Sequence, residues 1–438
     1  MTRNHIFGLS STDREILHLA VPSIVTNITT PLLGLMDVAI TGHMGSAAYL
    51  GAIAVGGSIF NMLYWLFGFL RMGSSGMTAQ AYGSGDARLQ AVILRQALTV
   101  AFCVAALMIL LQRPICREAL RFMDADPTTE KFASQYFYIL IWGAPAMLGQ
   151  YVLTGWFLGV QNSRIPMFVS IFINLSNIAI SIVLVYLFRL GLTGVALGTL
   201  SAQWLGFILA VAIGRHKYRL SPTKLSDILR LNALKRFFTV NTDIFLRTVC
   251  LVTVTIWFTR VGARQGDIML AVNALLMQFF TLFSFFMDGF GFSGEAMVGK
   301  YIGKRDSTML RLTVSHICRW ALGIALVFTC IYALGGDIIL NLLSSEPEVV
   351  TRAHDFLPWA ATIPLMGFMA FTWDGVFIGA TATRSMLISM FIATAIFFIT
   401  LYIFGPRLGN HGLWLAFILY LFTRGLVLSI MAKYKIRV

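Results

Sequence analysis

Charged side chains are scarce in this sequence. They make up 12% of its 438 residues, whereas hydrophobic residues make up 58% and the mean hydropathy is +0.78. Soluble domains carry roughly 25% charged residues. The scarcity of charge excludes an ordinary soluble domain and indicates an integral membrane protein.

The sequence also lacks the motifs of most catalytic sites. It has no H-E-x-x-H, no P-loop and no G-x-S-x-G motif, and its five cysteines form neither a disulfide framework nor a metal-ligand spacing. Gly83-Ser-Gly-Asp86 spells the G-x-G-D of intramembrane aspartyl proteases, but it lies in a polar loop, so we expect a turn with a helix cap. We therefore expect no enzyme, no cofactor and no metal site.

Long apolar runs fill most of the chain, and a membrane-spanning helix needs about 20 such residues. The fold class predicted is all-α integral membrane, with twelve transmembrane helices in two six-helix bundles related by an internal parallel repeat. The twelve predicted segments are 14–41, 47–72, 89–112, 131–158, 164–187, 192–214, 237–260, 268–299, 310–335, 350–380, 385–405 and 411–432.

The two halves of the chain repeat each other at an offset of 217 to 220 residues. The matched positions include Gly45 with Gly262, Pro145 with Pro364, Gly159 with Gly379, and Gly191 with Gly409. Six helices per half give both halves the same orientation in the membrane, which is an architecture of secondary transporters.

The repeat predicts three parts: an N-terminal lobe (1–214), a cytoplasmic linker (215–236) and a C-terminal lobe (237–438). The linker is rich in Lys and Arg, and a short surface helix over 226–235 stays open. The positive-inside rule places both termini in the cytoplasm, and it explains the net charge of +14 without nucleic acid.

One carboxylate lies near the end of the first predicted helix. Thr26, Thr30, Asp37 and Thr41 are spaced 4, 7 and 4 residues apart, so they share one helical face, and Pro31 allows a bend there. An acid at membrane depth is costly and usually functional. Because burial disfavours the ionised form unless a cation lies beside it, a proton and a cationic substrate can compete for Asp37.

A second polar stripe runs along the fifth predicted helix. Its members are Ser170, Asn174, Asn177 and Ser181, and Thr199 and Gln203 lie one turn apart on the sixth helix. Two interpretations stay open. These side chains line a cavity with Asp37, or they hold helices together, as Asn and Ser often do in membranes.

The C-terminal half has its own charged residues inside predicted helices. Asp288 and Glu295 share a face, Asp374 lies in mid-helix, and Asp243 lies one turn before Arg247. These five residues are interpreted either as a second functional cluster or as a buried ion-pair network that shapes the lobe.

Several stretches together resemble the multidrug and toxic compound extrusion (MATE) family, in its DinF-like branch. They cover both halves of the chain and are Leu35-Met-Asp-Val-Ala-Ile-Thr-Gly-His-Met-Gly45, Asp243-Ile-Phe-Leu-Arg247, Asp288-Gly-Phe-Gly-Phe-Ser-Gly-Glu-Ala296, Asp374-Gly-Val-Phe-Ile-Gly-Ala-Thr381 and Gly409-Asn-His-Gly-Leu-Trp-Leu-Ala416.

The resemblance implies an antiporter that exports amphipathic organic cations by alternating access, with Asp37 as the coupling site. Two positions depart from the family pattern. Ser181 stands where relatives often have Asp, and Arg247 stands near where sodium-linked relatives have Glu. Without an acid at residue 181, Asp37 is the main titratable group of the N-terminal lobe, which argues against a mechanism with two acids there. Arg247 would repel sodium and so favours protons as the coupling ion, and a sodium-coupled antiporter is the alternative.

Two other classes of membrane protein agree less well with the sequence. A flippase of lipid-linked anions should carry a ring of Arg or Lys inside its helices, whereas the N-terminal lobe is mainly acidic there. A scaffold or receptor would not need the repeat or the mid-helix acids. We expect a monomer in the bacterial inner membrane, surrounded by the lipid bilayer, with small organic cations as its partners.

Overall fold

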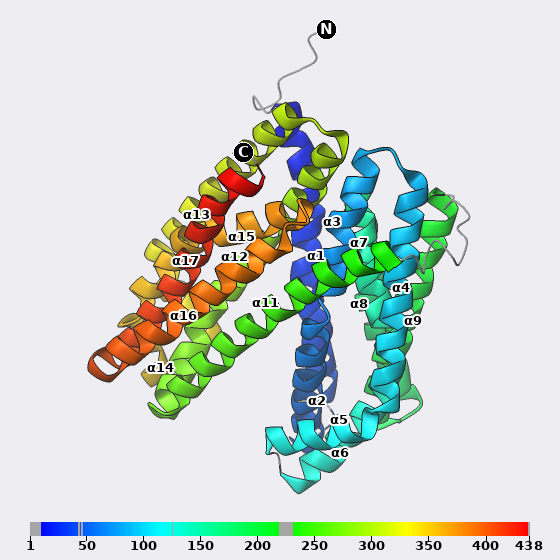
Figure 1. Cartoon of the computed structure of the whole chain (residues 1–438). Helices are drawn as coiled ribbons and strands as arrows, with labels where there is room; N and C mark the ends of the chain where they lie inside the picture. The colour runs from blue at the N-terminus through cyan, green and yellow to red at the C-terminus, as the bar shows by residue number, and fades with distance from the viewer. Residues whose placement is uncertain (1–9, 43, 45–46, 125, 219–230, 437–438) are drawn as a thin grey trace. The chain divides into compact units, whose positions relative to one another are not determined.

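The computed structural model describes residues 10–42, 44, 47–124, 126–218 and 231–436, without the side chains of 30, 47, 231–234 and 236. Every regular element in these residues is a helix (Figure 1). They are α1 (Ser11–Gly42), α2 (Ala47–Leu66), α3 (Phe69–Gly83), α4 (Ala87–Leu110), α5 (Gln112–Met123), α6 (Pro127–Leu140), η1 (Ile141–Gly143), α7 (Ala144–Gly159), α8 (Arg164–Ile182), η2 (Val183–Leu187), α9 (Gly191–Tyr218), α11 (Leu231–Ala263), α12 (Asp267–Lys304), α13 (Ser307–Leu343), α14 (Pro347–His354), α15 (Leu357–Gly379), α16 (Thr383–Leu408) and α17 (Asn410–Lys435).

Twelve spans in the described part of the chain are long and apolar enough to cross a membrane, which confirms the predicted number. The predicted limits differ most at 47–72, where the structure has two helices, α2 and α3, and α3 continues to Gly83. The predicted segment 350–380 is also divided into two helices, α14 and α15. Pro347 occupies the first turn of α14, where its missing N–H costs nothing, and Phe356 separates α14 from α15. Similarly, η1 interrupts the predicted helix 131–158.

The chain forms two compact units. One unit is Val25–Phe238, and the other combines Thr239–Val438 with Met1–Ile24. The sequence instead groups all of 1–214 in one lobe, so the first part of α1 is assigned differently. Residues 219–230, which hold most of the predicted linker and the first half of the possible helix 226–235, lie outside the described residues, and residues 231–235 belong to α11.

Polar contacts explain why the start of α1 belongs with the C-terminal half. The Asp13 carboxylate lies 2.7 Å from His316 Nδ1 and accepts a hydrogen bond of 3.0 Å from Trp320 Nε1, and both residues are on α13. Lys300 of α12 pairs with Glu15 at 2.9 Å. A charged contact costs more to break when both of its groups are buried. Asp13 and His316 are each only about 15% exposed, so their contact holds this segment more firmly than the Lys300–Glu15 pair does.

Close helix packing follows the internal repeat. A Cβ atom on Gly155 of α7 would overlap the carbonyl oxygen of Arg71 of α3, and one on Gly375 of α15 would overlap that of Gly291 of α12. Both members of the second pair lie 220 residues after those of the first. The same glycine contact therefore joins corresponding helices in the two units.

Helix caps follow the repeat as well. Leu89 N donates to Asp86 Oδ1 at 2.8 Å, and Met309 N donates to Asp306 Oδ1 at 3.0 Å. This confirms that Gly83–Asp86 is a turn with a helix cap and not a protease motif.

Gly375→Ala should destabilise the protein by about 1–3 kcal/mol, because the added methyl group forces α15 away from α12. The thermal unfolding midpoint of the purified protein in detergent measures this. Gly323→Ala on α13 is the matched control, since no atom lies within 4 Å of its added Cβ. Alanine is the better helix former, so this control should unfold at the same or a higher temperature. Equal midpoints for the two variants would contradict the close contact.

Candidate functional site

Asp37 lies near the C-terminal end of α1 and is 3% exposed. Three other helices supply its hydrogen-bond donors. Thr199 Oγ1 of α9 donates at 2.9 Å and Tyr136 OH of α6 at 3.4 Å, both to Oδ2, while Asn177 Nδ2 of α8 donates to Oδ1 at 3.2 Å. The carboxylate therefore joins four helices of the unit Val25–Phe238.

The Thr199 hydroxyl has two acceptors within reach. Besides Asp37 Oδ2, the carbonyl oxygen of Val195 lies 3.1 Å away, and Asn177 Nδ2 donates to Thr199 Oγ1 at 2.8 Å. A hydroxyl has one proton to donate and two lone pairs to accept. Thr199 can thus donate its hydrogen bond to an ionised Asp37. When Asp37 is neutral, Thr199 can instead donate to the carbonyl oxygen of Val195 and accept a hydrogen bond from the protonated Asp37.

No described Lys, Arg or His forms an ion pair with Asp37; its only described partners are the amide and hydroxyl groups given above. A buried carboxylate is normally paired with a cation or neutralised by a proton. Asp37 is therefore a buried acid whose charge the described side chains do not balance.

Two of the predicted cavity residues bind backbone elsewhere. Asn174 Nδ2 donates to the carbonyl oxygen of Thr29 at 2.8 Å, which joins α8 to α1 about two turns before Asp37. The Thr41 hydroxyl donates to the backbone oxygen of Asp37 at 2.7 Å. Of the predicted stripe on α8, only Asn177 contacts the carboxylate.

Ser181 and Gln203 are buried but do not contact Asp37. Ser181 Oγ faces Gly198 of α9, and Gln203 Oε1 faces Gly143 of η1. Neither oxygen has a hydrogen-bond partner among the described residues, and the same is true of Asn177 Oδ1. Thr30 belongs to α1, but its side chain lies outside the described residues.

Tyr136 is the site residue that sequence reasoning missed. It is 3% exposed and packs against Gly56 of α2. A tyrosine in an apolar helix has no distinguishing signal, because only the folded unit brings α6 beside α1.

The charged cluster of the other unit centres on Asp374 of α15. Its Oδ2 atom pairs with Arg247 Nη1 of α11 at 2.9 Å and with Arg424 Nη2 of α17. The two arginines are 5% and 3% exposed. Both guanidinium groups therefore bind the same carboxylate oxygen. Arg424 was also missed, although a basic residue in the middle of predicted helix 411–432 is a usable signal.

The other acids predicted for this cluster are Asp243, Glu295 and Asp288. Asp243 accepts a hydrogen bond of 3.0 Å from Thr383 Oγ1 and lies 3.7 Å from Arg384 Nη1. Glu295 is buried on α12, and Asp288, on the same helix, is partly buried. Among the described residues, no three His, Cys, Asp or Glu side chains are grouped as metal ligands would be.

The internal repeat shows what the second unit has in place of the Asp37 site. The offsets of 217, 220 and 218 residues that match the neighbouring anchors carry Asp37 to Val254, Asn177 to Phe397 and Thr199 to Phe417. These three side chains are apolar and at most 3% exposed. The polar arrangement around Asp37 therefore has an apolar counterpart in the second unit.

Comparison with known proteins agrees with this fold. The MatE family model matches residues 22–183 and 243–403. DNA damage-inducible protein F of Escherichia coli (strain K12) is 38% identical over 96% of this chain and 92% of its own length. Multidrug resistance protein MdtK of Photorhabdus laumondii is 25% identical over 93% of this chain and 92% of its own length.

A crystal structure of MATE in complex with MaL6 superimposes with a TM-score of 0.86 at 18% identity, covering 98% of this chain and 97% of the other. At that identity the match concerns the fold. The family model and the 38% identical relative span both halves of the chain, so this multi-pass membrane protein belongs to the MatE family.

Proposed function

We propose that this protein exports amphipathic organic cations in exchange for protons by alternating access. The observation that carries the proposal is a buried carboxylate, Asp37, with hydrogen-bond donors around it and no ion pair to any described side chain. The printed name of the 25% identical relative, a multidrug resistance protein, supports the substrate class. The Lys- and Arg-rich loops support an inner-membrane location with both termini cytoplasmic.

Competition for one charge provides the coupling. A buried carboxylate is stable when it is protonated or when a cation lies beside it. Binding of an organic cation then requires Asp37 to have lost its proton, and binding of a proton displaces the cation. Because the two occupants exclude each other, outward movement of one is linked to inward movement of the other.

Thr199 supports reversible protonation of Asp37. Its hydroxyl can turn between Asp37 Oδ2 and the carbonyl oxygen of Val195, at 2.9 and 3.1 Å. In either charge state of Asp37, every proton at this site therefore keeps an acceptor. A polar network that is satisfied in both states avoids the cost of an unpaired buried group.

Sodium fits this site less well than a proton. Hard cations are held by several oxygen ligands. Asp37 instead faces the N–H group of Asn177 and the hydroxyls of Thr199 and Tyr136, which donate to it. In the other unit, the guanidinium groups of Arg247 and Arg424 already bind Oδ2 of Asp374, so this oxygen is occupied by fixed positive charges.

Asp37→Asn should abolish dye export driven by a pH gradient in inverted vesicles, because the amide has the shape of the acid but cannot take up and release the proton. Wild-type transport should collapse with the gradient and be the same with or without sodium. Ser181→Ala is the matched control, since its buried hydroxyl has no hydrogen-bond partner among the described residues. Normal export by Asp37→Asn would overturn the assignment.

Thr199→Val should slow export by about tenfold or more, because a hydrogen bond to a charged group contributes about 1.5–3 kcal/mol. Thr199→Ser, which keeps the hydroxyl, should transport at close to the wild-type rate in the same vesicles. If both variants behave alike, the hydroxyl at residue 199 has no part in transport.

Asp374→Asn tests whether the second cluster is structural. It leaves two buried arginines without their carboxylate, so we expect a loss of about 3 kcal/mol of stability and a lower unfolding midpoint. Asp37→Asn leaves no described charged side chain without a partner, so this variant should unfold near the wild-type midpoint. A stable Asp374→Asn protein that fails to transport would instead place coupling in this cluster.

A further inference from the structure

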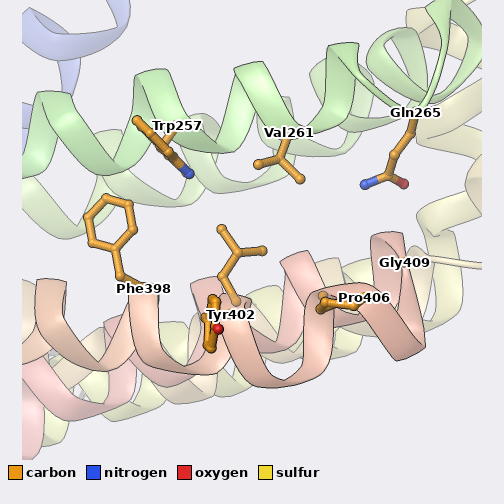
Figure 2. A pocket seen from close by; sticks show the side chains of 9 residues that line it. Trp257, Val261, Gln265, Phe398, Tyr402, Pro406 and Gly409 are labelled. Atoms are coloured by element: carbon orange, nitrogen blue, oxygen red, sulfur yellow. The ribbon is translucent and has the colours of Figure 1, made fainter.

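A pocket of about 480 Å³ lies between α11 and α16, inside the unit that contains Thr239–Val438. Figure 2 shows Trp257 and Val261 of α11, and Gln265 just after this helix, facing Phe398, Tyr402 and Pro406 on the α16 side. Tyr402 is 84% exposed, so the pocket opens to the outside of the helix bundle. None of these residues contacts Asp37, which lies in the other unit.

The lining is mostly apolar and aromatic. Trp257 and Phe398 meet edge to face with ring centroids 5.5 Å apart, and Val261 and Leu401 continue the apolar surface. The volume lies in the range of roughly 300–1,000 Å³ that is usual for small-molecule pockets. Such a surface binds a hydrocarbon chain and offers few partners to a polar ligand.

Three arginines lie close in sequence to residues that line this pocket. The guanidinium group of Arg260 lies 5.1 Å from the centre of the Trp257 ring. Arg264 precedes the lining residue Gln265, and Arg407 follows the lining residue Pro406. All three are exposed, and Asp267 at the start of α12 is the acid nearest in sequence to Arg260 and Arg264. The rim is therefore net positive, which disfavours an organic cation and favours an anionic group.

The position of the pocket along its two helices matches the level of the membrane interface. It lies where α11 and α16 both end, at Ala263 and Leu408. Trp and Tyr concentrate at the level of the lipid headgroups, and Arg side chains near helix ends extend to the same level. An apolar pocket with a basic rim at this depth matches the two chemical parts of one molecule, a lipid with a negatively charged headgroup.

We infer that the pocket between α11 and α16 binds an anionic phospholipid. An acyl chain fills the space between Trp257, Phe398 and Tyr402, and the headgroup phosphate lies against Arg260, Arg264 and Arg407. This lipid site is separate from the proposed transport site, and the inference does not depend on proton coupling.

Quenching of tryptophan fluorescence by brominated lipids tests the site. The purified protein is reconstituted in phosphatidylcholine containing increasing fractions of brominated phosphatidylglycerol or brominated phosphatidylcholine. The wild-type signal minus that of Trp257→Phe gives the share of Trp257. Trp204 has the same exposure, 37%, and Trp204→Phe gives the matched control signal.

The Trp257 signal should be half-quenched at a fraction of brominated phosphatidylglycerol about fivefold lower than that of brominated phosphatidylcholine, since basic residues favour anionic headgroups. The Trp204 signal should respond equally to both lipids. Equal quenching of Trp257 by the two lipids would mean contact with bulk lipid only and would overturn the inference.

The arginines are tested by the triple variant Arg260→Gln, Arg264→Gln and Arg407→Gln, which should lose the headgroup preference of Trp257. The matched control removes the same number of exposed charges from α5, at Arg113, Arg117 and Arg121, and should keep the preference. A triple variant that retains it would show that the rim does not select the headgroup.

Discussion

A carboxylate inside a membrane-spanning helix has to be satisfied by its neighbours, because hydrocarbon offers it neither water nor counter-ions. Asp37 obtains its partners from α6, α8 and α9, so one side chain brings together four helices of its unit. Those partners are hydroxyl and amide groups. They lower the cost of burying the acid without fixing its charge, which is the condition that a reversible exchange site requires.

The two units share one helical frame and differ in their chemistry. Glycines at corresponding positions, Gly155 and Gly375, let α3 approach α7 and α12 approach α15 with backbone almost in contact with backbone. On that frame one unit carries a buried acid that forms no ion pair with a described side chain, and the other carries Asp374 bound by two arginines. The two units therefore share their helix contacts, whereas their buried polar residues lie at different positions.

The two acids also differ in their partners. Two guanidinium groups, which are always charged, bind Oδ2 of Asp374. Removal of this carboxylate would therefore leave two buried charges without it. Where the first unit has Asp37 and Asn177, the second has Val254 and Phe397. Farther along the same helices, the aromatic pocket between α11 and α16 faces outward, toward the place where lipid would lie.

The sequence by itself determined the class, the twelve spans and the repeat, and it located the acid Asp37 in the first span, because hydropathy and helical spacing act locally along the chain. It singled out Asn177 and Thr199 but not Tyr136 or Arg424. It also grouped Asn174 and Gln203 with Asp37, although Asn174 binds the backbone of Thr29 and Gln203 faces Gly143. Only the tertiary structure decided these partners. Spacing assigns a residue to a face of its own helix, whereas a hydrogen bond depends on which helices become neighbours and how closely they approach.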